Sequence, residues 1–90
     1  MLQVELVPDL SNCIETVAKK EYQKTVKQLL TVGEESEEIQ EKVEALRLFL
    51  ETADFKKLRR ESEMHLVEGR TVRFVIYLKH GILKYDMRVS

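Results

Sequence analysis

The sequence predicts an α+β fold in which a short N-terminal strand and an antiparallel helical hairpin precede a three-strand antiparallel meander, with the helices on one face of the sheet. Apolar residues recur at steps of three and four over residues 10–53, which is typical of amphipathic helices. From residue 71 to residue 90 they alternate with polar residues, which is typical of strands. The alternation breaks at Lys79-His80-Gly81, and a short break that contains glycine indicates a hairpin.

Length and composition indicate one small unit. With 90 residues, of which 43% are hydrophobic, residues 1–90 are expected to form a single α+β domain. The net charge of -1 gives no overall attraction to nucleic acid or to anionic membranes. No run of about 18 apolar residues occurs, so no membrane association is expected. The single cysteine, Cys13, cannot form an internal disulfide, which suits the reducing cytoplasm.

The chain is expected to begin with a short strand. Leu2, Val4 and Leu6 alternate with polar residues, and Pro8 ends the alternation. Residues 1–33 as a whole carry equal numbers of acidic and basic side chains, so the net charge of this part is zero.

A first helix is expected over about residues 10–32. The side-chain oxygen of Asp9 or Ser11 can accept hydrogen bonds from the first turn and so cap it. Gly33 is suited to the position after its end because glycine tolerates positive φ. Its apolar stripe consists of Ile14, Val17, Ala18, Tyr22, Val26, Leu29 and Leu30.

A second helix is expected to start at Ser36, with the acidic residues behind it favoured by the helix dipole. Asp54 can cap a further helical piece, and whether residues 54–63 continue the second helix or form a separate one stays open. The short connection between the first two helices predicts that they are antiparallel. The apolar stripe of the second helix consists of Ile39, Val43, Leu46, Phe49, Leu50 and Ala53.

The C-terminal part is expected to form the meander. Residues 64–67 alternate and are expected as its first strand, followed by a turn at Glu68-Gly69-Arg70. The inward faces of the next two strands consist of Val72, Phe74, Ile76, Leu78, Leu83, Tyr85, Met87 and Val89.

No residue pattern points to catalysis, to a metal or to a cofactor. His65 and His80 lack other ligands at suitable spacing, whereas a tetrahedral metal site needs about four. A helix N-terminus can lower the pKa of a thiol such as Cys13, but packing is its favoured role because no histidine is near it in sequence. We therefore expect no cofactor, no metal site and no catalytic residues, and we favour a non-enzymatic protein.

The outward face of the last two strands is the candidate binding surface. Apolar side chains in the middle of a charged face are unusual on a solvated sheet. Three interpretations are open: packing on a second chain, contact with RNA through cations and a stacking tyrosine, or a plain cross-strand pair. The face consists of Arg73, Val75, Tyr77, Lys79, Lys84, Asp86 and Arg88.

The segment Val4-Glu5-Leu6-Val7-Pro8, together with Leu58-Arg59-Arg60 and the later run Val72-Arg73-Phe74-Val75-Ile76-Tyr77, resembles the RelE/ParE toxin family. The expected order of strand, helical hairpin and antiparallel sheet is similar to that family too. The resemblance implies a ribonuclease-type toxin, with RNA contacts at Arg59, Arg73, Tyr77 and Arg88. No catalytic residue is carried over, because no basic segment follows the last strand in the sequence.

Charge is unevenly distributed along the chain, and two interpretations are open. The charged residues form solvated faces with internal complementarity, or they form a basic surface for an anionic partner that the acidic helix masks or meets in a second copy. Residues 34–53 carry seven acidic and two basic side chains, whereas residues 54–90 carry nine basic and five acidic ones. The prediction is a small interaction module that self-associates, through the outward sheet face or through the acidic second helix. Its expected partner is a second copy or a small protein. The alternative is an RNA-binding protein or a RelE/ParE-like ribonuclease toxin.

Overall fold

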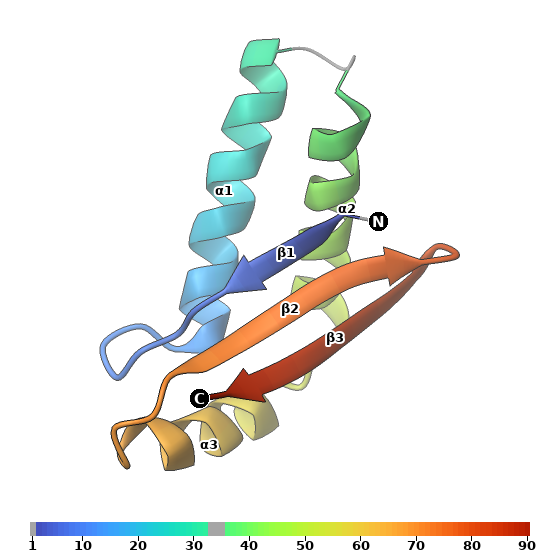
Figure 1. The fold of residues 1–90 in the computed structure, drawn as a ribbon. Coiled ribbons are helices and arrows are strands. Elements are labelled where there is room, and N and C mark those ends of the chain that lie inside the picture. Colours follow the sequence, from blue (N-terminus) through green and yellow to red (C-terminus); the bar gives the residue numbers. More distant parts are fainter. Residues whose placement is uncertain (1, 33–35) are drawn as a thin grey trace.

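The computed structural model describes residues 2–32 and 36–90. Its elements confirm the α+β class with a short N-terminal strand, a helical hairpin and a three-strand antiparallel sheet (Figure 1). In chain order they are β1 (Gln3–Leu6), α1 (Ile14–Val32), α2 (Glu37–Thr52), α3 (Phe55–Leu66), β2 (Val72–Lys79) and β3 (Ile82–Val89).

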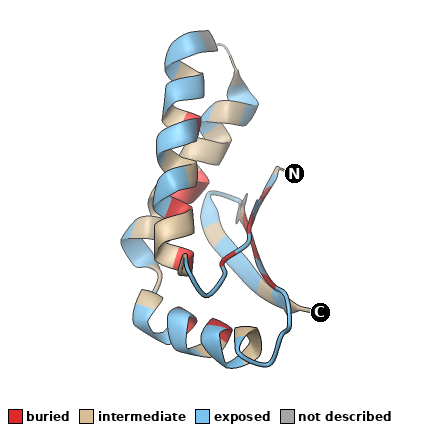
Figure 2. Cartoon of the chain, turned by 90° about the vertical axis from the view of Figure 1, so that its left-hand side faces the viewer, coloured by how far each residue is buried: buried red, intermediate tan, exposed pale blue. Residues whose placement is uncertain are grey.

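The sheet has the order β1-β2-β3, and both pairs are antiparallel. The register places Leu6 opposite Phe74 on the β1 side and Val72 opposite Val89 on the β3 side. The helices lie on one side of this sheet, as Figure 2 shows with the two layers seen edge-on. On the opposite face, which we call the outer sheet face, the described residues form no second layer.

The core lies between the helices and the inner sheet face, where the buried residues gather (Figure 2). Phe49 on α2 is fully buried, and its ring meets the edges of Phe55 at 5.3 Å and of Tyr85 at 5.4 Å. Such edge-to-face pairs are favourable beyond the area that they bury. The core residues are Val4, Leu6, Ile14, Ala18, Ala45, Leu46, Phe49, Leu58, Val72, Phe74 and Ile76.

The helical hairpin extends beyond the sheet, and the molecule is accordingly elongated, with a longest dimension of 43 Å (Figure 1). Leu30, expected in the buried stripe of the first helix, is 80% exposed there. Thr25 is fully buried instead, and its hydroxyl donates to the carbonyl oxygen of Glu21 at 2.7 Å. An ion pair of 2.8 Å between Lys42 and Glu21 joins the two helices.

Helix α1 begins later than the sequence predicted. The Asp9 carboxylate accepts hydrogen bonds from the backbone N–H groups of Ser11 and Asn12, at 2.8 and 2.7 Å. This keeps residues 9–12 in a loop, so neither Asp9 nor Ser11 caps the helix. Cys13 stands directly before its first residue, and the carbonyl of Cys13 accepts from Val17. The expected C-terminal glycine, Gly33, lies outside the described residues.

The caps of the other two helices were predicted correctly. Ser36 accepts from the N–H of Ile39 at 3.3 Å, and Asp54 accepts from the N–H of Lys57 at 3.2 Å. Ala53 between them is extended, with φ -71° and ψ 140°, so α3 is a separate helix and not a continuation of α2.

The strand expected over residues 64–67 is wrong. Met64, His65 and Leu66 form the last turn of α3, and Val67 caps it with helical backbone angles. Leu58, Ser62 and Leu66 continue one helical stripe at steps of four, and four residues of alternation are too few to outweigh it. The third strand of the sheet is therefore β1, which pairs with the central strand β2.

The hairpin between β2 and β3 has a tight two-residue turn. His80 and Gly81 both have positive φ, at 54° and 76°, as a type I′ turn requires. The turn leaves Lys79 opposite Ile82 and sets a continuous register along both strands. The predicted turn at Glu68-Gly69-Arg70 is also present, with φ 81° at Gly69.

Candidate interaction surface on the sheet

The outer sheet face is built from all three strands. The predicted alternation of β2 and β3 is confirmed by the register, which sets Arg73 opposite Arg88 and Tyr77 opposite Lys84. Strand β1 adds Gln3 and Glu5, which sequence reasoning missed because the pairing of β1 with β2 has no local signal. The face consists of Gln3, Glu5, Arg73, Val75, Tyr77, Lys79, Ile82, Lys84, Asp86 and Arg88.

Arg73 is not a free cation on this face. Its guanidinium donates to the carboxylate of Glu5 at 3.2 Å, across the β1–β2 pair. Both side chains are about half exposed, so solvent screens the pair and its contribution to stability is small. Its effect is to neutralise one of the cations that the sequence places here.

Val75 offers much less apolar surface than its position suggests. It is only 5% exposed, although it lies on the outer face. The register flanks it with Glu5 on β1 and Asp86 on β3, with Arg73 and Tyr77 on either side of it along β2. Tyr77 is half-buried in the same way. The apolar centre expected on this face is therefore largely covered by neighbours within one chain.

The remaining cations of the face are solvent-exposed. Lys79, Lys84 and Arg88 form no ion pair with another residue in the described part of the chain. Asp86 lies between Lys84 and Arg88 on β3, so the charges alternate in sign along this strand. The surface is polar and mixed in charge, with a moderate excess of positive side chains.

Arg59 is separated from the other candidate residues. It lies on α3, on the helical side of the sheet, and its guanidinium donates to Glu63 at 2.9 Å. It lines two small hollows, of about 240 and 280 Å³, together with Cys13. It therefore cannot share a contact surface with Tyr77.

Cys13 is half-buried at the start of α1. Its sulfur lies 3.4 Å from the hydroxyl of Thr16. Hydrogen bonds from the side chain and the backbone of Thr16 lower the pKa of the Cys13 thiol, against an opposing effect of burial, and the Arg59 charge lowers it further. The expected buried-packing role is thus only partly met, since the sulfur sits at a polar helix start.

We expect the Cys13 thiol to titrate at a lower pH in the folded protein than in the unfolded chain. Iodoacetamide alkylation, followed by mass spectrometry across a pH series, measures this midpoint with and without urea. Thr16→Val should raise the folded midpoint toward that of the unfolded chain. Thr31→Val, which removes an exposed hydroxyl that donates to the backbone carbonyl of Lys27, serves as the control. Equal midpoints for the folded and unfolded wild-type protein would contradict the assignment.

The free edge of β3 is a feature that sequence reasoning did not identify. This strand pairs with β2 on one side and forms the edge of the sheet on the other. Ile82 is 59% exposed and Tyr85 is 39% exposed, although Tyr85 belongs to the inner face and touches Phe49. The helices contact β2 more extensively than β3, so the apolar row of the edge strand is incompletely covered.

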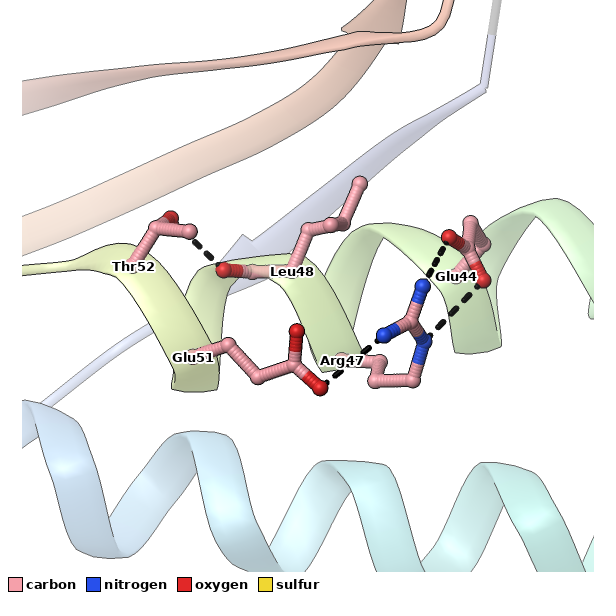
Figure 3. A network of polar contacts seen from close by, with 5 residues as sticks. All are labelled: Glu44, Arg47, Leu48, Glu51 and Thr52. Atoms are coloured by element: carbon pink, nitrogen blue, oxygen red, sulfur yellow. Dashed lines mark hydrogen bonds and ion pairs between the residues drawn. The ribbon is translucent and has the colours of Figure 1, made fainter.

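Part of the negative charge of the acidic helix α2 is neutralised by an arginine of the same helix. Arg47 donates to both carboxylate oxygens of Glu44 and, at 2.9 Å, to Glu51 (Figure 3). The hydrogen bonds from Arg47 to Glu44, and next to Glu51, raise the pKa of the Arg47 guanidinium. One turn further on, Thr52 donates to the carbonyl of Leu48 at 2.7 Å. Two of the acids of this helix are thus already paired within it.

Other kinds of site have little support. Among residues 2–32 and 36–90, no three His, Cys, Asp or Glu side chains gather closely enough to hold a metal ion. In the same ranges, no helix has the length and apolar character needed to cross a bilayer. A hollow of about 610 Å³ lies on the helical hairpin, between Ile39 and the long polar side chains of α1, and it contains no convergent catalytic groups.

Comparison with known proteins provides a family but no activity. An uncharacterized protein of Archaeoglobus fulgidus is 47% identical over 51 residues, which cover 54% of this chain and 60% of that protein. The match therefore spans less than two thirds of the relative's length. No solved structure matches the chain. A protein-family model matches residues 2–86, almost the whole chain, and the chain belongs to that family.

Proposed function

We propose that this protein is a non-enzymatic interaction module that self-associates through the uncovered side of its sheet. The observation that supports this most is the arrangement of the layers: helices cover one face, while the outer face and the β3 edge face solvent. A three-strand sheet with an open edge is a surface that commonly acquires a partner strand or a partner layer. The lone Cys13 suits a reducing compartment, and the proposed location is the cytoplasm.

The sheet is a better candidate for this contact than the acidic helix. On α2, Arg47 holds Glu44 and Glu51, and Lys42 is used by Glu21 of α1. A partner that approached α2 would have to compete with these existing pairs. The β3 edge presents backbone groups that have no such competitor within the sheet.

The test is the mass of the purified protein in solution. Sedimentation equilibrium between about 1 and 100 µM should show a monomer–dimer equilibrium, the range over which contacts of modest area associate. A monomer throughout that range would refute self-association. Tyr77→Glu places a charge in the middle of the outer sheet face, so it reports whether this face itself is the contact.

The second candidate function is RNA binding, which the resemblance to RelE/ParE toxins implies. It is favoured by Lys79, Lys84 and Arg88, three exposed cations on one sheet, with Tyr77 among them. Phosphate contacts make affinity fall steeply with salt. Fluorescence anisotropy with a labelled single-stranded RNA measures this directly, and absence of binding at about 50 mM salt would exclude the candidate.

A further inference from the structure

The hydrogen-bonding groups of the β3 edge can be assigned residue by residue. Thr71 and Ser90 exchange two backbone hydrogen bonds of 3.0 Å, so they form a hydrogen-bonded pair of the β2–β3 ladder. Such pairs alternate with non-hydrogen-bonded ones along an antiparallel ladder. Because the register is continuous, Asp86 and Lys84 also direct their backbone groups to β2. The N–H and C=O groups that point away from the sheet are those of Leu83, Tyr85, Met87 and Val89.

Among the features that usually protect a sheet edge from pairing, β3 has only charged side chains. Protective features include proline, bulges, very short strands and charged side chains, above all lysine. Strand β3 runs for eight residues without a proline, and its pairing with β2 shows one partner per residue. Its outward side chains carry charge, but the sign alternates through Lys84, Asp86 and Arg88. A row of alternating charges can pair favourably with a strand whose charges alternate in the opposite order, because each charge then faces one of opposite sign.

We propose that β3 pairs antiparallel with β3 of a second copy, around a two-fold axis at Tyr85. In this register Lys84 lies opposite Asp86 of the second copy on the outer face, and by symmetry the same pair forms twice. On the inner face Leu83 lies opposite Met87 of the second copy, so two half-covered apolar side chains meet. Tyr85 faces its own equivalent at the axis. The proposal rests on the self-association proposed above and specifies its geometry.

Backbone and side-chain requirements agree in this register. The outward groups of Leu83, Tyr85 and Met87 meet their equivalents and form about six hydrogen bonds across the axis. The Lys84–Asp86 pairs fall at non-hydrogen-bonded positions, where opposing side chains approach most closely. The product is a continuous six-stranded sheet with the helices of both copies on the same side.

Neighbouring registers are less favourable, because they place like charges opposite one another or shorten the ladder. An axis at Asp86 places Asp86 against its own equivalent and Lys84 against Arg88, so like charges face one another. An axis at Lys84 places the two lysines together. An axis at Met87 pairs Asp86 with Arg88, but it leaves Ile82 and Leu83 without partners and shortens the ladder. The axis at Tyr85 combines opposite charges with nearly the full length of the strand.

Charge reversal tests the proposed pairing. Lys84→Asp and Asp86→Lys each replace two attractive pairs by two repulsive ones, and each should raise the dimer dissociation constant about tenfold. The double variant Lys84→Asp/Asp86→Lys exchanges the two signs and should restore wild-type affinity. Lys79→Asp is the matched control, because it reverses a charge on β2 that is also exposed and that faces no group across the axis. Circular dichroism confirms that each variant is folded.

Disulfide trapping tests the register independently of charge. In a Cys13→Ser background, which removes the single natural cysteine, Tyr85→Cys places two thiols opposite one another at the axis. Opposed hydrogen-bonded residues lie about 5.5 Å apart at Cα, within the range for a disulfide. Met87→Cys in the same background is the comparison, because that residue faces itself only if the axis lies at Met87. Tyr85→Cys should cross-link at least about tenfold faster under mild oxidation.

The outcomes of these experiments distinguish pairing through the β3 edge from self-association through another surface. Loss of dimer in the single reversals, with recovery in the double variant, supports the β3 pairing. A wild-type dimer that tolerates Lys84→Asp but dissociates on Tyr77→Glu would overturn the β3 pairing and retain self-association through the outer face. Faster cross-linking of Met87→Cys would overturn the register. A wild-type monomer up to about 100 µM would refute both proposals, since contacts this weak have no function at ordinary concentrations.

Discussion

Phe49→Ala should lower the free energy of unfolding by about 3–5 kcal/mol, a large part of the stability of a domain of this size. Phe49 is fully buried on α2, and its ring meets Phe55 of α3 and Tyr85 of β3 edge-to-face. Removing the ring leaves a cavity where two helices and a strand meet. This cavity is lined by three elements, so the shift of one side chain cannot fill it. Relaxation therefore recovers little of the lost free energy of unfolding.

Urea unfolding, followed by far-ultraviolet circular dichroism, measures this change by linear extrapolation. All samples are compared at one protein concentration, because dimer formation would add concentration-dependent stability. Leu30→Ala is the control: Leu30 is 80% exposed on α1, and its truncation should change stability by less than about 0.5 kcal/mol. A loss below about 1 kcal/mol for Phe49→Ala would mean that Phe49 is not at the centre of the core.

Leu6→Ala should cost about 2–5 kcal/mol, because the short strand β1 is part of the cooperative core. Leu6 is 1% exposed and lies opposite Phe74 of the central strand. The strand has only four residues, so loss of this anchor weakens its hydrogen bonds to β2 as well. The same change also disturbs the position of Glu5, which pairs with Arg73 on the other face.

Leu10→Ala provides a chemically identical control four positions along the chain. Leu10 is 66% exposed in the loop before α1, and its truncation should alter stability by less than about 0.5 kcal/mol. Native-state amide hydrogen exchange adds a local measurement, since Leu6→Ala should increase exchange at β1 more than at the β2–β3 hairpin. A stability loss for Leu6→Ala as small as the one expected for Leu10→Ala, below about 0.5 kcal/mol, would show that β1 is not part of the cooperative core.

Much of the fold could be predicted because its signals are local. The two faces of β2 and β3 follow from period-two alternation, and the turn at His80 and Gly81 follows from the break between the two runs. The caps at Ser36 and Asp54 follow from side-chain oxygens that accept backbone N–H groups three residues on. Each of these features depends on residues that are close in sequence.

The errors also have a common origin. Residues 64–67 alternate over one short stretch, and the helical stripe that starts at Leu58 decides their state because it packs on the rest of the core. The start of α1 depends on which backbone N–H groups donate to the Asp9 carboxylate. The same carboxylate can accept hydrogen bonds within a loop, as it does here, or from the first turn of a helix. Where a local pattern supports two conformations, the packing of distant segments selects one of them.

The candidate site was predicted only as a face. Alternation correctly placed Tyr77 with Lys84 and Arg88, but it could not show that neighbours cover Val75 or that Glu5 pairs with Arg73. Nor could it show that Arg59 belongs to the helical side. These facts depend on which strand lies beside which, and strand order is a property of the assembled sheet.

The sequence by itself determined the α+β class, the helical hairpin, the β2–β3 hairpin and the division of its two strands into an inner and an outer face. Periodicity and capping are local, so they are readable from the chain alone. The tertiary structure decided that β1 and not residues 64–67 completes the sheet, and that β3 remains at its edge. Edges arise from long-range pairing, so the surface proposed for self-association could be recognised only in the folded protein.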